Sequence, residues 1–489
     1  MAGLALYEDL ADLMANRQPA ALSVRLESVK VQGPPGAGGG TSTRLPAERL
    51  RMAVDAVEDA SDRNRTFCFS MNAPEEVDDG GPSSLSCEID VLASETAKPR
   101  LFCVAGGNLD NPLLLTDYQS MNDVTGMMSP AQAWNALTVA ACTDLVAVPA
   151  THLPVAPIGD LSPWSMTAVN WERQHRPPSK PDVVFEGGNQ MYDRVSNAVG
   201  PHADLSVLTT SMQTGAPLTL TGQTSAATAS VSGLCAALQA EYPALWPETI
   251  RGLVVHSAEH TAAMNVRAQG FAAARGSVQQ ALLERFGFGR PDRLRAMENA
   301  EDALTLINQS HLRPFRLNET ENAAVLGQMR FHKLPWPLEV LEELDGVEAE
   351  LRVTLSYFIS PNPGAVIQGA VRSYASHGFN FDMKRPDESN EDAVGRINKL
   401  HDRPALRTPG LRWKFGPQFR GRGGIKHDRL RLSNAADLAR MAGIMVHPLQ
   451  GWWGRDISRV EQQARYSLIV TIRTPEQEIY TEISNAILV

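Results

Sequence analysis

The fold is decided by residues 220–243, which read LTGQTSAATASVSGLCAALQAEYP. A polar turn containing Gly222 leads into a predicted helix of small residues. Ser225 falls in the first turn of this helix, and Val231, Leu234 and Leu238 form its buried stripe. Backbone N–H groups and the helix dipole at that position favour a developing oxyanion, as acyl transfer requires. A Thr-Ser pair before an Ala-rich helix is also a common N-cap, so these residues alone leave both interpretations open.

Other segments give this helix a context. Thr224, Ser225, Ala227 and Gly233 match Gly-Thr-Ser-x-Ala with a Gly eight residues after the Ser, so the segment resembles the nucleophile motif of subtilisin-like serine peptidases, the subtilases of peptidase family S8. Further resemblances follow in family order, at 101–108 (LFCVAGGN), 135–141 (NALTVAA), 161–165 (LSPWS), 180–183 (KPDV) and 286–290 (FGFGR). The resemblance covers about residues 1–300 and is strongest to the bacterial cytosolic type.

The resemblance implies specific roles. Ser225 would attack the scissile carbonyl, and its backbone N–H together with the Asn108 amide would form the oxyanion hole. Ser70 and Met71 would pair with an extended substrate, with Ala105 and Gly106 as the other wall of an apolar specificity pocket. Asn108 could instead be a turn residue, and Met71 a core residue.

Two motifs of the family are missing from this sequence. It lacks the Asp of the first strand and the His-Gly-Thr motif, although Met1-Ala2-Gly3-Leu4 resembles the end of that motif. A serine without a base is a poor nucleophile, so we expect the chain as given to be inactive or nearly so. A missed upstream start, a truncated gene and a peptide-binding pseudoenzyme all remain open.

Other groups are weak candidates for the missing base. Five histidines lie in this part of the sequence outside any His-Gly-Thr context: His152, His175, His202, His256 and His260. We interpret His256 and His260 as an ordinary surface pair rather than metal ligands, and Glu8 and Asp12 as a solvated helix face. Gln223 stands where the family usually has Gly, which leaves the width of the cleft in doubt.

The periodicities predict an α/β fold with a parallel sheet covered by helices. The resemblance implies that this fold is subtilisin-like over residues 1–305, with helices on both faces of the sheet, and that it is incomplete at its N-terminus. A mostly antiparallel β-sandwich-like domain follows at 311–489. Helices are expected at 1–17, 46–60 and 83–97, and strands at 22–31, 65–71 and 100–105. In the second half, strands are expected at 349–359, 374–383 and 466–473, with a short helix at 435–441. Residues 33–43 are expected to be a loop.

Composition limits the range of functions. The net charge of −10 gives no general attraction to nucleic acid or anionic lipid. The five cysteines lie mostly in apolar stretches without metal-ligand spacing, so we expect reduced core thiols, no metal and no cofactor. No basic n-region and no long apolar run occurs, and we therefore expect a cytoplasmic protein.

One local patch could bind a charged partner. Residues 402–431 are rich in Lys and Arg interleaved with Trp413, Phe415 and Phe419. A nucleic-acid backbone or an acidic protein would suit such a run, but a solvated Gly-rich loop is the simpler interpretation, and nucleic acid is not our expected partner. The expected partners are a protein or peptide substrate and a regulatory protein bound through the C-terminal domain, with no membrane.

Overall fold

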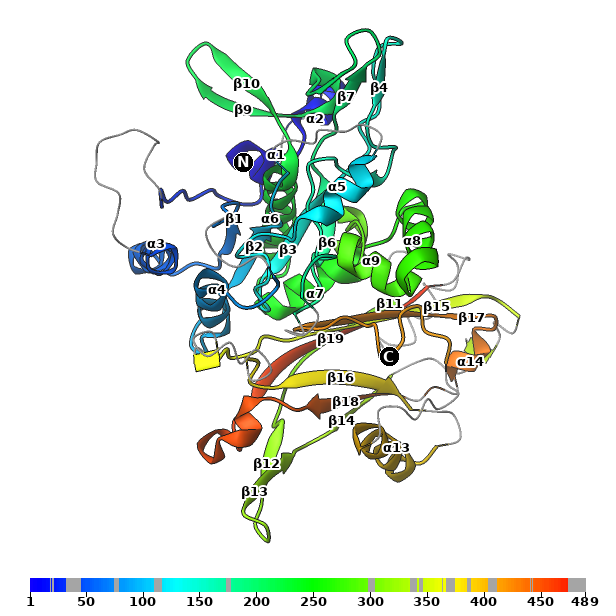
Figure 1. The fold of residues 1–489 in the computed structure, drawn as a ribbon. Coiled ribbons are helices and arrows are strands. Elements are labelled where there is room, and N and C mark those ends of the chain that lie inside the picture. Colours follow the sequence, from blue (N-terminus) through cyan, green and yellow to red (C-terminus); the bar gives the residue numbers. More distant parts are fainter. Residues whose placement is uncertain are drawn as a thin grey trace. The chain divides into compact units, whose positions relative to one another are not determined.

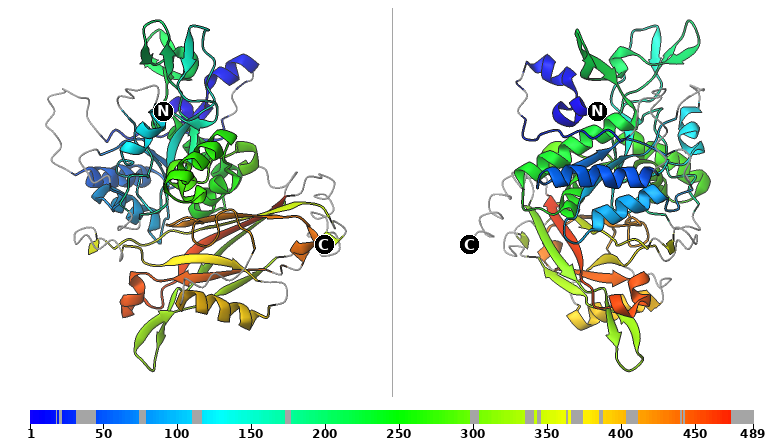
Figure 2. Two further views of the ribbon diagram at one scale, coloured as in Figure 1. Left: turned by 45° about the vertical axis from the view of Figure 1, so that its right-hand side comes forward. Right: turned by 90° about the vertical axis from the view of Figure 1, so that its left-hand side faces the viewer.

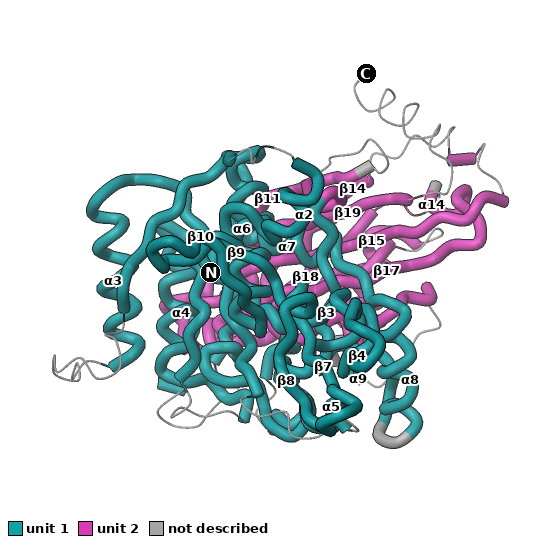
Figure 3. The backbone as a smooth tube through the Cα atoms, turned by 90° about the horizontal axis from the view of Figure 1, so that it is seen from above, with its two compact units in different colours: residues 1–293, 361–374 teal, residues 294–360, 375–489 magenta. Residues whose placement is uncertain are grey.

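A computed structural model describes most of the chain. The described residues are 1–17, 19, 22–31, 45–73, 79–109, 117–172, 177–297, 304–334, 341–342, 346–362, 364–365, 374–384, 388–402, 411–439, 441 and 443–473. The expected loop at 33–43 lies outside them. The chain divides into two compact units, residues 1–293 with 361–374 and residues 294–360 with 375–489 (Figure 3). The domain limits at 305 and 311 remain a prediction.

Unit 1 is built on a sheet with a parallel centre. Its strands pair in the order β1 (Thr66–Phe69), β2 (Leu101–Ala105), β3 (Leu137–Thr143) and β6 (Val183–Glu186), all parallel, and β5 (Asp160–Leu161) pairs antiparallel with β3. Strands β2 and β3 are fully buried, as near-continuous apolar runs predict for a parallel sheet. The predicted α/β class is confirmed.

Helices accompany this sheet. Helix α6 (Gln223–Glu241) contacts β1, β2, β3 and β6, and Figure 1 shows it running alongside them. The other helices of unit 1 after residue 45 are α3 (Pro46–Ala60), α4 (Ser84–Ser94), α5 (Tyr118–Val124), α7 (Pro247–Ser257), α8 (Ala262–Arg275) and α9 (Val278–Phe286), and α10 (Arg293–Met297) begins where unit 1 ends. Helix α3 has the predicted bounds because Pro at its first position starts it and Leu50 and Val54 are buried. No described helix is long and apolar enough to cross a membrane.

Smaller β elements project from unit 1. They are the sheet of β4 (His152–Pro154), β7 (Met191–Asp193) and β8 (Ala198–Gly200), and the hairpin of β9 (Val207–Gln213) and β10 (Ala216–Thr221). The views of Figure 2 show the hairpin extending away from the central sheet. It leads directly into α6.

The first predicted helix is interrupted. Residues 1–17 form two helices, α1 (Ala2–Tyr7) and α2 (Leu10–Asn16), because Glu8 adopts a left-handed φ of 56° and Asp9 caps α2 through Ala11 N. The apolar stripe expected for one helix would comprise Leu4, Leu6, Leu10, Leu13 and Met14, but of these only Leu4 is buried, and Met14 is exposed. The prediction of one amphipathic helix was therefore wrong.

The expected strand at Leu22–Val31 is also absent. These residues alternate as a strand should, yet they belong to no strand. A strand requires a neighbour for its backbone groups, and no described segment pairs with this one. Leu22, Leu26 and Val29 remain exposed as a result.

Unit 2 is antiparallel, as predicted. One sheet has the order β11 (Leu304–Leu312), β19 (Ala464–Arg473), β15 (Ala349–Ser356), β17 (Ile425–Leu432); another has the order β14 (Arg330–Lys333), β18 (Gly443–Leu449), β16 (Gly378–Met383). A hairpin, β12 (Phe315–Asn318) with β13 (Ala323–Leu326), and the helices α13 (Asn390–Asp402) and α14 (Ala436–Ala439) complete it. Side chains of the two sheets touch, since Phe379 packs edge-on against Tyr466 at 5.6 Å between ring centroids. The β-sandwich remains an interpretation.

The basic run of unit 2 is buried in part and exposed in part where the structure describes it. Arg420 is buried, pairs with Asp428 at 3.1 Å and lies over the Phe381 ring. Lys426 is buried too, and burial lowers its pKa to about 7. Arg412 and Arg422 are exposed, and residues 403–410 lie outside the described part. For Arg420 and Lys426 the expectation of a solvated loop was wrong, because Arg420 pairs with Asp428 and Lys426 donates to the Gly421 carbonyl oxygen inside the fold.

Candidate active site

The site begins where β10 passes into α6. Gly222 is the N-cap residue, and a Cβ there would lie 2.8 Å from the Gly187 carbonyl oxygen. Gln223 donates its N–H to the same oxygen at 2.6 Å and has a φ of 70°, in the left-handed region that favours glycine. Gln223, which stands where the family usually has Gly, therefore occupies a strained backbone conformation, and its side chain is accommodated at an energetic cost.

Ser225 is the third residue of α6 and is half-buried. Its Oγ donates to the Ser70 carbonyl oxygen at 3.4 Å and makes no hydrogen bond to a histidine or carboxylate among the described residues. Backbone N–H groups in the first turn of a helix have no partner within the helix, so they are available to an anion.

Asn108 lies beside this helix, three residues beyond the end of β2. Its Oδ1 accepts hydrogen bonds from Thr224 N at 2.9 Å and from Thr224 Oγ1 at 2.7 Å. Because the Thr224 N–H can only donate, the atom facing it must be the amide oxygen, and Nδ2 points elsewhere with its donors free of described partners. The structure thus brings Asn108 and Ser225 together, and Thr224 orients the amide. That orienting contact was missed, although Thr224 was part of the motif.

The predicted substrate segments also meet here. Ser70 and Met71 follow the end of β1 and are half-buried, and the neighbouring Asn72 donates from Nδ2 to the Ala105 carbonyl oxygen at 3.2 Å. Ala105 is fully buried, so it can offer a substrate little beyond its backbone. A Cβ on Gly106 would lie 2.3 Å from Met127 Cε, so a larger residue there would require the end of the methionine side chain to move.

Other candidates from the sequence do not join the site. His256 is buried, and His260 Nε2 lies 2.9 Å from the Gly287 carbonyl oxygen, so the expected surface pair is partly enclosed. Glu8 pairs with Arg293, and Asp12 is exposed. His152 and His202 face each other with 5.9 Å between ring centroids, and His175 lies outside the described residues. No group of three His, Cys, Asp or Glu with metal-binding geometry occurs in the described part.

Two buried charges support the sheet below the site. Lys180 donates from Nζ to Asp182 Oδ2 at 2.6 Å and to the Ala136 carbonyl oxygen at 2.9 Å, with its pKa lowered by burial. Asp182 also accepts from Thr138 N at 2.7 Å, which holds the loop before β6 against β3.

Asp90 on α4 is the second buried charge. It accepts from the backbone of Asn135 at 2.7 Å and of Trp134 at 3.1 Å, and from Tyr374 Oη at 2.7 Å. Burial raises the pKa of Asp90 to about 6. Asp90 was not singled out from the sequence, although its partner Asn135 begins the quoted segment 135–141.

Comparisons with known proteins agree with the motifs. A model of the subtilase family matches residues 1–289, more than half of the chain. No curated protein matches.

Several solved structures are similar over about half of the chain. The prenylagaramide maturation protease PagA is 15% identical, with 53% of this chain and 69% of that chain covered and a TM-score of 0.32. The self-cleaved protease domain of PatA is 17% identical, with 51% and 66% covered and a TM-score of 0.30. The leader-peptide processing protease EpiP of Staphylococcus aureus is 15% identical, with 53% and 56% covered and a TM-score of 0.31. At these scores the assignment depends on the family model.

Proposed function

Because the chain belongs to the subtilase family, we propose that it is a serine-type endopeptidase whose nucleophile is Ser225. The observation that carries this proposal is the contact between Thr224 and Asn108. It fixes an amide with free N–H donors next to a serine at the start of a helix. The Asn108 amide and the Ser225 backbone N–H would then both donate to the oxyanion of the substrate, which is the arrangement that acyl transfer needs.

In the proposed reaction, Ser225 Oγ attacks the carbonyl carbon of the scissile peptide bond. A base takes the hydroxyl proton, and negative charge develops on the carbonyl oxygen. Asn108 Nδ2 and the Ser225 backbone N–H would stabilise that charge. The proton then passes to the departing amine, which leaves an acyl-enzyme that water hydrolyses.

We propose that Ser70 and Met71 hold the substrate. They continue the direction of β1 beyond its last paired residue, so an extended peptide can add to their backbone with little demand on its sequence. Gly106 and the backbone of Ala105 would form the opposite wall, with Met127 giving it an apolar floor.

The sequence has no His-Gly-Thr motif, which is the motif that would supply the catalytic base. We therefore propose that these 489 residues bind peptides at this cleft but hydrolyse them only when a base is supplied to Ser225. The alternative is a pseudoenzyme that binds peptides without chemistry. It is favoured by the Ser225 hydroxyl, which among the described residues donates to the Ser70 carbonyl oxygen rather than to a base.

Chemical rescue separates these alternatives. Free imidazole should act as the missing base, so labelling of Ser225 by a fluorophosphonate probe should rise roughly 100-fold with imidazole, within the range of general-base effects. Ser225→Ala must abolish the labelling. Asn108→Ala should lower the rescued rate roughly 10²-fold to 10³-fold, as for other oxyanion donors. Binding of peptides without any labelling in imidazole would leave the pseudoenzyme as the function.

Two further parts of the proposal concern context. All five cysteines are free thiols, which supports a reducing, cytoplasmic compartment. Unit 2 would bind a regulatory protein partner.

A further inference from the structure

Three of the five cysteines lie close together between the central sheet of unit 1 and α6. They are Cys68 on β1, Cys103 on β2 and Cys235 on α6, and we call them the thiol cluster. None of the three takes part in the proposed reaction. However, β2 leads to Asn108 and α6 carries Ser225, so a bond between Cys103 and Cys235 would join the two elements that position the site.

Cys103 and Cys235 already have their sulfurs in contact. The two Sγ atoms are 3.8 Å apart, and both residues are 0% exposed. The sulfurs of a disulfide are about 2.05 Å apart, so a bond requires the two thiols to move closer, by rotation of their side chains or by a small shift of α6 against β2. Since no surface of this pair is open to solvent, an oxidant dissolved in water needs another point of entry.

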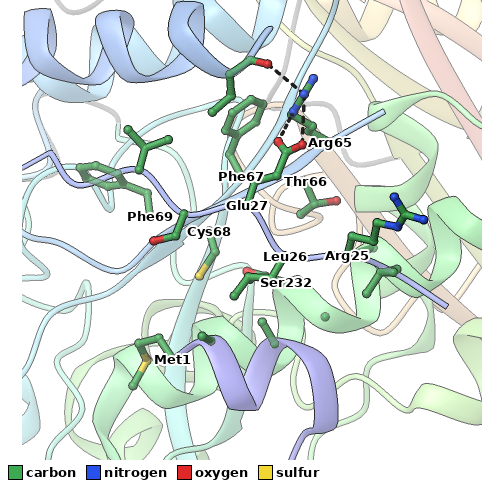
Figure 4. Close-up of a pocket in the computed structure, with 18 of the residues that line it drawn as sticks. Met1, Arg25, Leu26, Glu27, Arg65, Thr66, Phe67, Cys68, Phe69 and Ser232 are labelled. Atoms are coloured by element: carbon green, nitrogen blue, oxygen red, sulfur yellow. Dashed lines mark hydrogen bonds and ion pairs between the residues drawn. The ribbon is translucent and has the colours of Figure 1, made fainter. Parts of the chain in front are cut away.

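The Cys68 thiol provides such a point of entry. Cys68 is the exposed one of the five free cysteines, and it lines a cavity of about 720 Å³ bounded by β1, α1, α3, α6 and residues 23–31. Figure 4 shows the Cys68 thiol pointing toward Ser232. Ser232 lies one helical turn before Cys235 on α6, so these two residues share a side of that helix. Cys68 therefore faces the part of α6 that carries the buried Cys235.

Cys68 and Cys103 are neighbours across the sheet. Strands β1 and β2 are parallel, and their register pairs Cys68 with Cys103. Neighbouring strands are about 4.8 Å apart, which lies within the range of Cα separations that a disulfide can bridge. The hydrogen bond with Cys103 and burial hold the pKa of the Cys235 thiol well above its usual range, and Cys68 adds to that shift. Cys103 thus has a thiol neighbour on β1 and another on α6.

We propose that the thiol cluster is a site of modification by hydrogen peroxide, in which oxidation enters at Cys68 and is retained as a disulfide between Cys103 and Cys235. In the first step the Cys68 thiolate attacks one oxygen of the peroxide and the O–O bond breaks. The other oxygen leaves as water with its own hydrogen and the thiol proton, and Cys68 becomes a sulfenic acid.

Two further steps move the oxidation inward. The Cys103 sulfur attacks the Cys68 sulfur, the S–O bond breaks, and the hydroxyl group leaves with the Cys103 proton as a second water. The Cys235 sulfur then attacks the Cys103 sulfur, the bond between Cys68 and Cys103 breaks, and the Cys235 proton passes to Cys68, which returns to a thiol. Two thiols are oxidised in total, and one peroxide is reduced to two molecules of water.

The reaction should be slow at neutral pH. Burial raises the pKa of the Cys68 thiol above its usual range, although part of its surface is open to the cavity. Since the thiolate is the form that attacks peroxide, the cluster should respond to sustained oxidation rather than to a brief pulse. In a reducing compartment, thiol reductants would return the cluster to the free thiols of the structure. Neither the modification nor its test depends on peptidase activity.

The test treats the 489-residue protein with hydrogen peroxide at alkaline pH, blocks the remaining thiols and maps the disulfides by mass spectrometry. The Cys68–Cys103 disulfide should appear first, the Cys103–Cys235 disulfide should replace it, and dithiothreitol should remove both. Cys87→Ala and Cys142→Ala are matched controls at buried cysteines outside the cluster, and both should leave this order of products unchanged. No disulfide within the cluster, or a main product that contains Cys87 or Cys142, would overturn the proposal.

Three variants should each stop a different step. Cys68→Ala removes the point of entry and should slow formation of the Cys103–Cys235 disulfide roughly tenfold or more. Cys235→Ala should accumulate the Cys68–Cys103 disulfide, and Cys103→Ala should leave a sulfenic acid on Cys68 that dimedone labels. An unchanged rate of Cys103–Cys235 formation in Cys68→Ala would overturn entry at Cys68 and with it the proposal. If a variant fails to fold, the order in which the two disulfides appear in the unaltered chain still decides.

Discussion

The two sides of the central sheet of unit 1 differ sharply. Beside β3 and β6 the interior is closed, and Lys180 and Asp182 are buried there as an ion pair. Toward β1 the sheet ends at a cavity of about 720 Å³ whose far wall has a strand pattern but no strand. The difference teaches that periodicity shows whether a segment is suited to be a strand. Whether it forms one depends on a neighbouring strand with which its backbone can pair.

The largest effect should come from breaking the closed side. Lys180→Met leaves the Asp182 carboxylate buried with only the Thr138 N–H, so the free energy of unfolding should fall by about 3–5 kcal/mol. Lys98→Met, which removes an exposed pair with Asp62, should change it by less than about 1 kcal/mol. Urea denaturation measures both. If the two variants lost the same unfolding free energy, the buried pair of Lys180 would contribute no more to stability than the exposed pair of Lys98.

A pH dependence should follow from Asp90. Its folded pKa of about 6 lies above the value near 4 of an unfolded carboxyl, so the folded state holds the proton more tightly. The stabilisation is fully present below the unfolded pKa and is lost as the pH rises through the folded pKa. Over that window the free energy of unfolding should decline by roughly 3 kcal/mol, at about 1.4 kcal/mol per pKa unit.

Asp90→Asn provides the comparison, because it keeps the shape and removes the titration. The difference in unfolding free energy between the unaltered protein and this variant should change with pH between about 4 and 6 and be flat above about 7. A pH-independent difference would show that Asp90 does not titrate in this window.

A smaller gain should come at the start of α6. Gln223→Gly removes a side chain from a φ of 70° and should raise stability by about 1 kcal/mol, since the relieved strain exceeds the added chain entropy. Asn322→Gly, at a φ of 49°, is the matched control and should gain less, because Asn tolerates this region. Thermal unfolding of both variants measures the difference, and equal gains would argue against strain at Gln223.

The smallest effect tests the open side. Ala236→Leu extends into the cavity and should be neutral or stabilising by less than about 1 kcal/mol. The same change at the fully buried Ala229 on α6 should cost about 1–3 kcal/mol through overpacking. If both substitutions cost the same, the cavity cannot accept a larger side chain and the contrast between the two sides of the sheet fails.

The sequence predicted the elements whose causes are local. Pro46 and the apolar spacing of α3 gave its bounds, and the Gly-Gln-Thr-Ser turn placed Ser225 in the first turn of α6. It could not predict that residues 22–31 form no strand, because that depends on a neighbour. The buried state of Arg420 was missed for the same kind of reason, since its partner Phe381 is far away in the sequence.

The site divides in the same way. Asn108 and Ser225 were predicted as a pair from a resemblance, whereas the hydrogen bonds from Thr224 that orient the amide required coordinates. The Tyr374–Asp90 contact joins residues 284 apart, a separation at which no local pattern carries information. Residue roles assigned by resemblance at Ser70, Met71, Ala105 and Gly106 stay predictions.

Tyr374 has a practical consequence for anyone who prepares unit 1 by itself. Residues 361–374 group with this unit although they follow a long stretch of the other one, so the chain passes between the units three times. A recombinant fragment ending at residue 293 would lack Tyr374 and its hydroxyl donor to Asp90. A faithful fragment would include residues 361–374 together with 1–293. Exchange of modules at a single junction, the usual way in which genes recombine domains, would separate that tyrosine from its carboxylate.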